Sequence, residues 1–151
     1  MIEINVQVES QNQKIPNKTQ LKKWCSIVFK KNQQYALCLR IVDKTESQNL
    51  NSKWRKKDYP TNVLSFPLDI PQGLFETNFL GDVIICAPII EQEAFEQKKD
   101  IQAHWAHIII HGCLHLLGYD HISDEDAQVM EELEVNLLKK LGFSNPYISN
   151  N

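Results

Sequence analysis

The sequence contains no Cys-x-x-Cys pair and no dense group of cysteines. Its four cysteines stand far apart in the chain, at Cys25, Cys38, Cys86 and Cys113. Paired cysteines are typical of thiolate zinc sites, and closely spaced cysteines are typical of small secreted domains held by disulfides. Because neither pattern is present, we expect buried, reduced thiols.

Long apolar runs and a surplus of positive charge are also missing. No stretch reaches the roughly 18 apolar residues of a membrane span, and the chain opens on an alternating pattern at 2–8 instead of a signal peptide. The net charge is -3, so any binding to RNA must use a local basic patch. We expect a cytoplasmic protein that does not contact a membrane.

Glycine and proline are too sparse to form a linker, with 5 and 6 residues respectively in a chain of 151. There is no internal repeat and no low-complexity tract. A hydrophobic share of 42% is that of an ordinary folded domain and not of a disordered chain. We therefore expect residues 1–151 to form a single domain with its own core.

The periodicity of apolar residues predicts strands and helices in mixed order. Alternation predicts strands at 2–8, 35–41, 61–68 and 79–86, with a turn at 71–73 between the last two. Helical spacing and capping residues predict helices at 17–32 with Asn17 as cap, from a capping box at 45–48, from Pro88, at 101–117, and from Ser123 to about Gly142. This mixture favours an α+β or α/β sandwich in which helices cover a small sheet.

All five histidines fall between positions 104 and 121, and three of them belong to the stretch HGCLHLLGYDH at 111–121. On a helix, His111 and His115 lie about 40° apart on one face, one turn from each other. Gly118 can adopt the left-handed conformation that ends a helix, which would return His121 to the same face. The spacing therefore predicts three ligands for one metal ion.

Three neutral imidazoles without a thiolate suit zinc, with the fourth position left for water as in catalytic sites. A competing ligand pair is His107 with His111, which also has i, i+4 spacing. We interpret His104 and His107 mainly as structural residues. Cys113 points about 200° away from His111 around the helix, so we expect a small buried residue there and not a ligand.

The spacing HxxxHxxGxxH is also that of metzincin proteases, in which a glutamate follows the first histidine and serves as general base. Here that position is Gly112. Without the carboxylate, peptide hydrolysis by the usual route lacks its proton acceptor. The histidines thus indicate hydrolysis of another kind of bond. Asp82 and Asp120 remain open as proton acceptors, and Asp120 is equally typical of a local turn cap.

Together with RKKDYPTNVLSFP at 55–67, LGDVIIC at 80–86 and GFSNPY at 142–147, the histidine motif resembles the YbeY family of bacterial single-strand-specific endoribonucleases. The resemblance covers most of the chain and implies an α+β fold with a central four-stranded sheet. It also implies zinc, one ion per chain, at His111, His115 and His121. The implied substrate is ribosomal RNA of the small subunit, in 3′-end maturation and ribosome quality control.

The resemblance further implies a functional arginine at Arg55. On its own, the run KWRKKD would be interpreted as a solvated helix end, although it is the densest positive cluster of the chain and contains the aromatic Trp54. Near a zinc site, a guanidinium could offset charge that develops on phosphate. Two alternatives stay open: a metal-dependent hydrolase of another substrate such as peptide, and a ribosome assembly factor with a mainly structural zinc.

Overall fold

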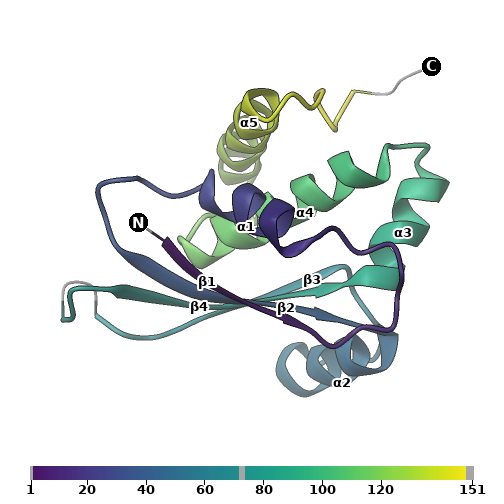
Figure 1. The fold of residues 1–151 in the computed structure, drawn as a ribbon, viewed down its shortest axis with the longest axis horizontal. Helices are drawn as coiled ribbons and strands as arrows, with labels where there is room; N and C mark the ends of the chain where they lie inside the picture. Colours follow the sequence, from purple (N-terminus) through teal and green to yellow (C-terminus); the bar gives the residue numbers. More distant parts are fainter. Residues whose placement is uncertain (1, 72–73, 149–151) are drawn as a thin grey trace.

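A four-stranded sheet with the order β1-β2-β4-β3 forms the centre of the computed structural model, which describes residues 2–71 and 74–148 (Figure 1). Neighbouring strands run parallel except at one edge, where β3 is antiparallel to β4. The strands are β1 (Ile2–Val8), β2 (Tyr35–Val42), β3 (Val63–Pro67) and β4 (Asn78–Cys86). The predicted α+β class and four-stranded sheet are confirmed. Residues 72–73 of the predicted turn lie outside the described residues.

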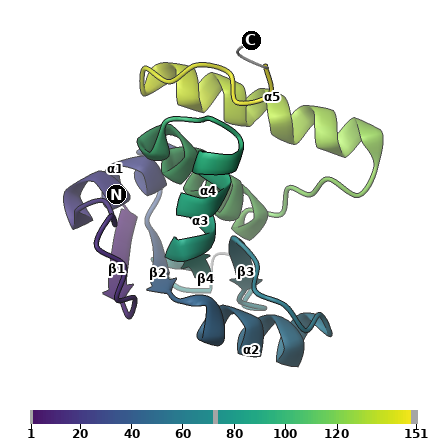
Figure 2. The ribbon, with the colours of Figure 1, turned by 90° about the vertical axis from the view of Figure 1, so that its right-hand side faces the viewer.

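Helices cover the two faces of the sheet unequally. α2 (Lys44–Arg55) lies alone on one face (Figures 1 and 2). The other face carries α1 (Lys18–Ser26), α3 (Ala87–Glu96) and α4 (Ile101–Leu116), and α5 (Asp124–Lys140) packs on the outer side of α4 (Figure 2). Among all these helices, none is both long and apolar enough to cross a membrane.

Most of the hydrophobic core lies between α4 and the sheet. The central strands β2 and β4 supply fully buried side chains such as Leu39 and Val83, as expected where both faces of a strand are covered. α4 contributes Trp105, Ile109 and Ile110. A smaller cluster on the opposite face joins β-strand residues to α2, and comprises Val42, Leu64 and Ile84 with Leu50 and Phe66 packed against them. The helix that carries the histidines is therefore the best-anchored helix of the fold.

Several predicted helix ends are confirmed by their capping contacts. The side chain of Asn17 accepts a hydrogen bond from the backbone N–H of Gln20 at 2.9 Å. Ser123 likewise accepts from the N–H of Asp126 at 3.1 Å, and Pro88 lies in the first turn of α3. These contacts satisfy N–H groups that have no partner within the helix.

Two local predictions are wrong. α1 ends at Ser26 and not at residue 32 as predicted. At this end the Ser26 hydroxyl donates to the carbonyl of Lys22 at 2.6 Å, and such a side-chain bond competes with the backbone bonds of the helix. α2 begins at Lys44, which places Thr45 inside the helix, so the predicted capping box does not form. Its N-cap residue is Asp43, whose carboxylate accepts from the backbone N–H of Gln11 at 3.0 Å instead of capping the helix.

Candidate metal centre and nucleic-acid groove

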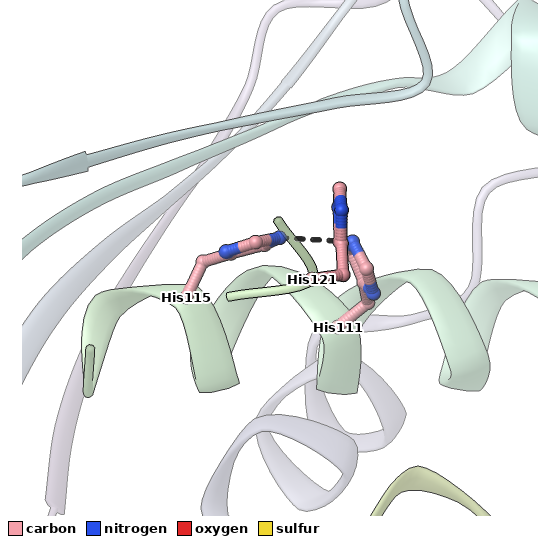
Figure 3. A group of neighbouring side chains, drawn as sticks. All are labelled: His111, His115 and His121. Atoms are coloured by element: carbon pink, nitrogen blue, oxygen red, sulfur yellow. Dashed lines mark hydrogen bonds between the residues drawn. The ribbon is translucent and has the colours of Figure 1, made fainter. Parts of the chain in front are cut away.

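Helix α4 presents His111 and His115 on the same face, one turn apart (Figure 3). Their Nε2 atoms face each other at 3.1 Å. Two nitrogens bound to one tetrahedral zinc at about 2.0–2.1 Å would be about 3.3–3.4 Å apart. The two imidazoles are thus close to the spacing that a shared metal ion requires.

The loop after α4 brings His121 to the same place. Gly118 has a positive φ of 100°, and its N–H donates to the carbonyl of His115 at 3.0 Å. The centroid of the His121 ring lies 5.5 Å from that of His111 and 5.1 Å from that of His115 (Figure 3). One nitrogen of each ring lies within 4.8 Å of the others, so the three could hold a metal ion. The predicted left-handed turn at Gly118 is confirmed.

The surroundings of His115 favour the neutral form that binds metals. Burial lowers the pKa of His115, and the neighbouring imidazoles of His111 and His121 lower it further. A neutral imidazole keeps a free electron pair on one ring nitrogen. The donor set therefore fits a divalent cation that accepts nitrogen ligands.

The other two histidines of α4 point elsewhere. Nε2 of His107 contacts the carboxylate of Glu134 at 3.0 Å, and Nε2 of His104 contacts that of Glu93 at 2.9 Å. His111 turns its Nδ1 toward Glu134 as well, at 3.3 Å, which leaves its Nε2 for the cluster. The structure does not bring His107 into the histidine cluster with His111.

Gly112 lies where α4 approaches the sheet most closely. A Cβ at this position would meet Cγ1 of Val83 at 2.7 Å and Cγ2 of Val63 at 3.0 Å. A glutamate could not occupy this position without separating the helix from the sheet. The missing metzincin carboxylate thus has a packing reason.

The cysteines are free, as expected, and those at positions 25, 86 and 113 are buried, whereas Cys38 is partly exposed. The Sγ atoms of Cys25 and Cys113 lie 3.6 Å apart. This contact and burial raise the pKa of the Cys113 thiol. Cys113 is therefore a small core residue, as the sequence predicts.

A cavity of about 610 Å³ opens beside the histidine cluster. Arg55, the last residue of α2, lines it together with the three histidines of the cluster. The Nη2 group of Arg55 donates to the backbone carbonyl of Ser65 at 2.7 Å, and its guanidinium carbon lies 5.3 Å from the ring centroid of Phe66. The structure thus brings the predicted arginine and the predicted ligands to one cavity from opposite sides of the sheet.

The remaining basic residues near Arg55 divide between the cavity and the outer surface. Lys57 lines the cavity with Arg55, followed by the half-exposed Tyr59. Nζ of Lys53 instead lies 5.0 Å from the ring centroid of Trp54, which is exposed outside the cavity lining. Lys57 and Tyr59 give the cavity a positive and aromatic wall.

The comparisons with known proteins agree with this geometry. The sequence model of one family, Endoribonuclease YbeY, matches residues 5–142. The chain belongs to the YbeY family. Endoribonuclease YbeY of Pseudomonas fluorescens is 50% identical over 148 residues, which cover 97% of this chain and 97% of that protein. Endoribonuclease YbeY of Colwellia psychrerythraea is 49% identical over 150 residues, or 96% of each chain.

A solved structure shares the fold of this YbeY family member. The solution structure of a Thermotoga maritima protein aligns with a TM-score of 0.56 and 24% sequence identity. The alignment covers 95% of this chain and 99% of that one. At this level of identity the likeness supports the architecture alone.

In this YbeY family member, the two aspartates considered as proton acceptors lie in different places relative to the cavity. Asp120 lines the cavity, but its Oδ1 accepts from the backbone N–H of Ile122 at 3.2 Å, which is a local turn contact. Asp82 is exposed on β4 and does not belong to the cavity lining. Asp120 is the nearer of the two to the histidine cluster.

Sequence reasoning missed Glu134, which is fully buried on α5 and contacts both His107 and His111. A signal was present, because position 134 lies four residues after Met130 and four before Leu138, both buried. A carboxylate on an apolar stripe requires a buried partner. Burial raises the pKa of Glu134, but the hydrogen bonds from His107 and His111 lower it by more, to about 2.

Proposed function

We propose that residues 1–151 form one domain that acts as a zinc-dependent, single-strand-specific endoribonuclease. One zinc ion per chain would be held by His111, His115 and His121. The observation that carries this proposal is the convergence of three imidazoles and the Arg55 guanidinium on one open cavity. The family's endoribonuclease name supports RNA as the substrate.

Zinc at this position would supply a Lewis acid for phosphodiester hydrolysis and an activated water at neutral pH. The chain contributes the remaining charge through Arg55, whose Nη2 is fixed on the Ser65 carbonyl. A guanidinium has five N–H donors, so most remain available for phosphate oxygens in the cavity. Arg55 would then offset negative charge that develops on the phosphate.

The loop after α2 supplies a wall for a single RNA strand. Buried Asn51 donates from its side chain to the carbonyl of Tyr59 at 2.8 Å, and the Ser47 hydroxyl donates to the carbonyl of Thr61 at 3.0 Å. These bonds hold Lys57 and Tyr59 beside the cavity. Lysine attracts the phosphate backbone and an exposed tyrosine ring can stack on a base, which is the combination typical of single-strand binding.

The proposed substrate in the cell is ribosomal RNA of the small subunit. Cleavage there would contribute to maturation of the 3′ end and to ribosome quality control in the cytoplasm. This assignment is supported by the motifs shared with the YbeY family, including RKKDYPTNVLSFP at 55–67. The small ribosomal subunit would then be the principal macromolecular partner.

RNA cleavage by the purified protein tests the proposal. We expect a single-stranded oligoribonucleotide to be cleaved and the same sequence in a duplex to be spared. A chelator should abolish cleavage and added zinc should restore it, whereas casein-like peptides should stay intact. His115→Ala, which should be inactive, controls for contaminating nuclease. Zinc-dependent peptide hydrolysis would favour the protease alternative, and RNA binding without cleavage would favour the assembly factor.

A further inference from the structure

Glu134 is a fully buried carboxylate that belongs to α5, outside the histidine cluster. Its oxygens contact three groups: the hydroxyl of Tyr147 at 2.7 Å, Nε2 of His107 at 3.0 Å and Nδ1 of His111 at 3.3 Å. An ionised carboxylate is costly to bury unless it is paired and hydrogen-bonded. Three hydrogen-bonding groups converge on it, so the carboxylate forms part of a defined polar network.

The network determines where His111 carries its proton. An ionised carboxylate can only accept hydrogen bonds, so each group that faces Glu134 must donate. Nδ1 of His111 lies 3.3 Å from both oxygens of Glu134, as an N–H shared between two carboxylate oxygens would. Nδ1 of His111 therefore carries the hydrogen, and in the neutral ring Nε2 carries the free electron pair. That Nε2 is the atom that faces Nε2 of His115 at 3.1 Å.

We propose that Glu134 is a positioning residue for the metal centre: it holds the His111 ring with Nδ1–H toward α5 and the free electron pair of Nε2 toward His115 and His121. The hydroxyl of Tyr147, near the C-terminal end of the described chain, donates to the same carboxylate. This inference rests on the proposed function, because it assigns a purpose to the proposed ligand His111. A carboxylate behind a metal-binding histidine fixes the tautomer and raises the basicity of the ligand.

The same helix offers a natural comparison in the pair His104 and Glu93. These residues also form a histidine–carboxylate contact, at 2.9 Å and partly buried, but it uses Nε2 of His104. Nδ1 of His104 is buried and has no hydrogen-bond partner among the described residues. The pair lies outside the histidine cluster. Loss of Glu93 should therefore leave the metal centre unchanged.

The experiment compares Glu134→Gln with the matched control Glu93→Gln. Nitrogen NMR of the metal-free proteins reports the tautomer of His111, and competition with a chromophoric chelator reports the zinc dissociation constant. In wild type we expect His111 protonated at Nδ1. Glutamine leaves one acceptor oxygen for three donors, so Glu134→Gln should increase the Nε2-protonated form and weaken zinc binding about 10- to 100-fold. Glu93→Gln should match wild type in both measurements.

Tyr147→Phe covers the case in which Glu134→Gln does not fold. Tyr147 is 47% exposed, so the change is mild, and loss of its hydrogen bond should weaken zinc binding by roughly two- to tenfold. An unchanged His111 tautomer and unchanged zinc affinity in folded Glu134→Gln, or in Tyr147→Phe if the first variant is unfolded, would overturn the inference. Failure of wild type to bind zinc would refute the proposed function instead, while the tautomer measurement on metal-free protein would still decide the role of Glu134.

Discussion

The hydroxyl of Ser65 on β3 donates a hydrogen bond to the backbone carbonyl of Gly112 on α4, at 2.8 Å. The backbone carbonyl of the same serine accepts from Arg55 at 2.7 Å. Ser65 is thus bonded on one side to the helix of the histidine cluster and on the other to the arginine of the cavity. One residue of the edge strand fixes the two halves of the candidate site relative to each other.

The close approach at this point predicts that Gly112→Ala is destabilising. The added Cβ would lie 2.7 Å from Cγ1 of Val83, so the helix or the strand must shift. Overpacking of this kind costs about 1–3 kcal/mol of unfolding free energy. Chemical denaturation measures the change. Ser65→Ala removes a hydrogen bond without adding bulk and should lower the unfolding free energy by about 1 kcal/mol. Equal stability of Gly112→Ala and wild type would contradict the packing argument.

Removal of any one proposed ligand should abolish tight zinc binding. His111→Ala, His115→Ala and His121→Ala each leave two imidazoles, too few for a stable centre in a protein. His104→Ala is the matched control, because that residue lies on the same helix but outside the cluster. Metal analysis after dialysis measures the zinc content. Equal zinc in all four variants would refute the ligand assignment.

Arg55→Ala should retain zinc and fold but reduce single-turnover RNA cleavage by about 10²-fold or more, since an aimed cation in a site is worth several kcal/mol. Arg55→Lys keeps the charge but loses the planar fork, and we expect a large residual defect. Lys56→Ala, outside the cavity lining, should weaken RNA binding modestly and reduce its salt dependence. If Arg55→Ala cleaves RNA at the wild-type rate, the catalytic assignment of Arg55 is refuted.

The partly buried pair of Glu93 and His104 predicts a pH dependence of stability. Burial raises the pKa of Glu93, but hydrogen bonds from His104 and Asn62 lower it by more, with a smaller contribution from Lys99. A carboxyl whose pKa is lower in the folded chain stabilises the fold above its unfolded pKa, about 4.3. That stabilisation disappears as the pH falls through the folded pKa.

The measurement compares the unfolding free energy of wild type and Glu93→Gln between about pH 6 and pH 3. The difference in unfolding free energy between the two proteins should be largest near pH 6 and should shrink as the pH falls below about 4.3. Glu96→Gln, which changes an exposed carboxylate of the same helix, controls for the change in net charge. A difference that grows on acidification would contradict the sign of the Glu93 shift.

Local chemistry made much of the fold predictable. The alternation of apolar residues identified all four strands of the described sheet. Ser123 marked a helix start by its capping hydrogen bond, and Gly118 marked a helix end by its preference for a positive φ. The N-terminus of α2 was mispredicted because a tertiary contact overrides the local signal: Asp43 bonds to Gln11, far away in the sequence.

The candidate site was also predictable only in part. His111, His115 and His121 lie within eleven residues, so helix geometry and one glycine turn were enough to predict that they converge. The position of Arg55 across the cavity depends on strand order, which no local pattern encodes. Glu134 and His111 are 23 residues apart in sequence and lie on different helices, so their contact can be predicted only if the packing of these helices is known.

The position of β3 at the edge of the sheet has a further consequence. An unpaired strand edge is a template to which another extended chain can add. Here the carbonyl of Ser65 is occupied by Arg55, and Pro67 has no N–H to donate. A peptide cannot extend the sheet along β3 without displacing Arg55, whereas a nucleic acid needs no backbone ladder and can approach the same wall. The side chain that we assign to the phosphate thereby also protects the edge against strand addition by peptides and by other copies of the chain.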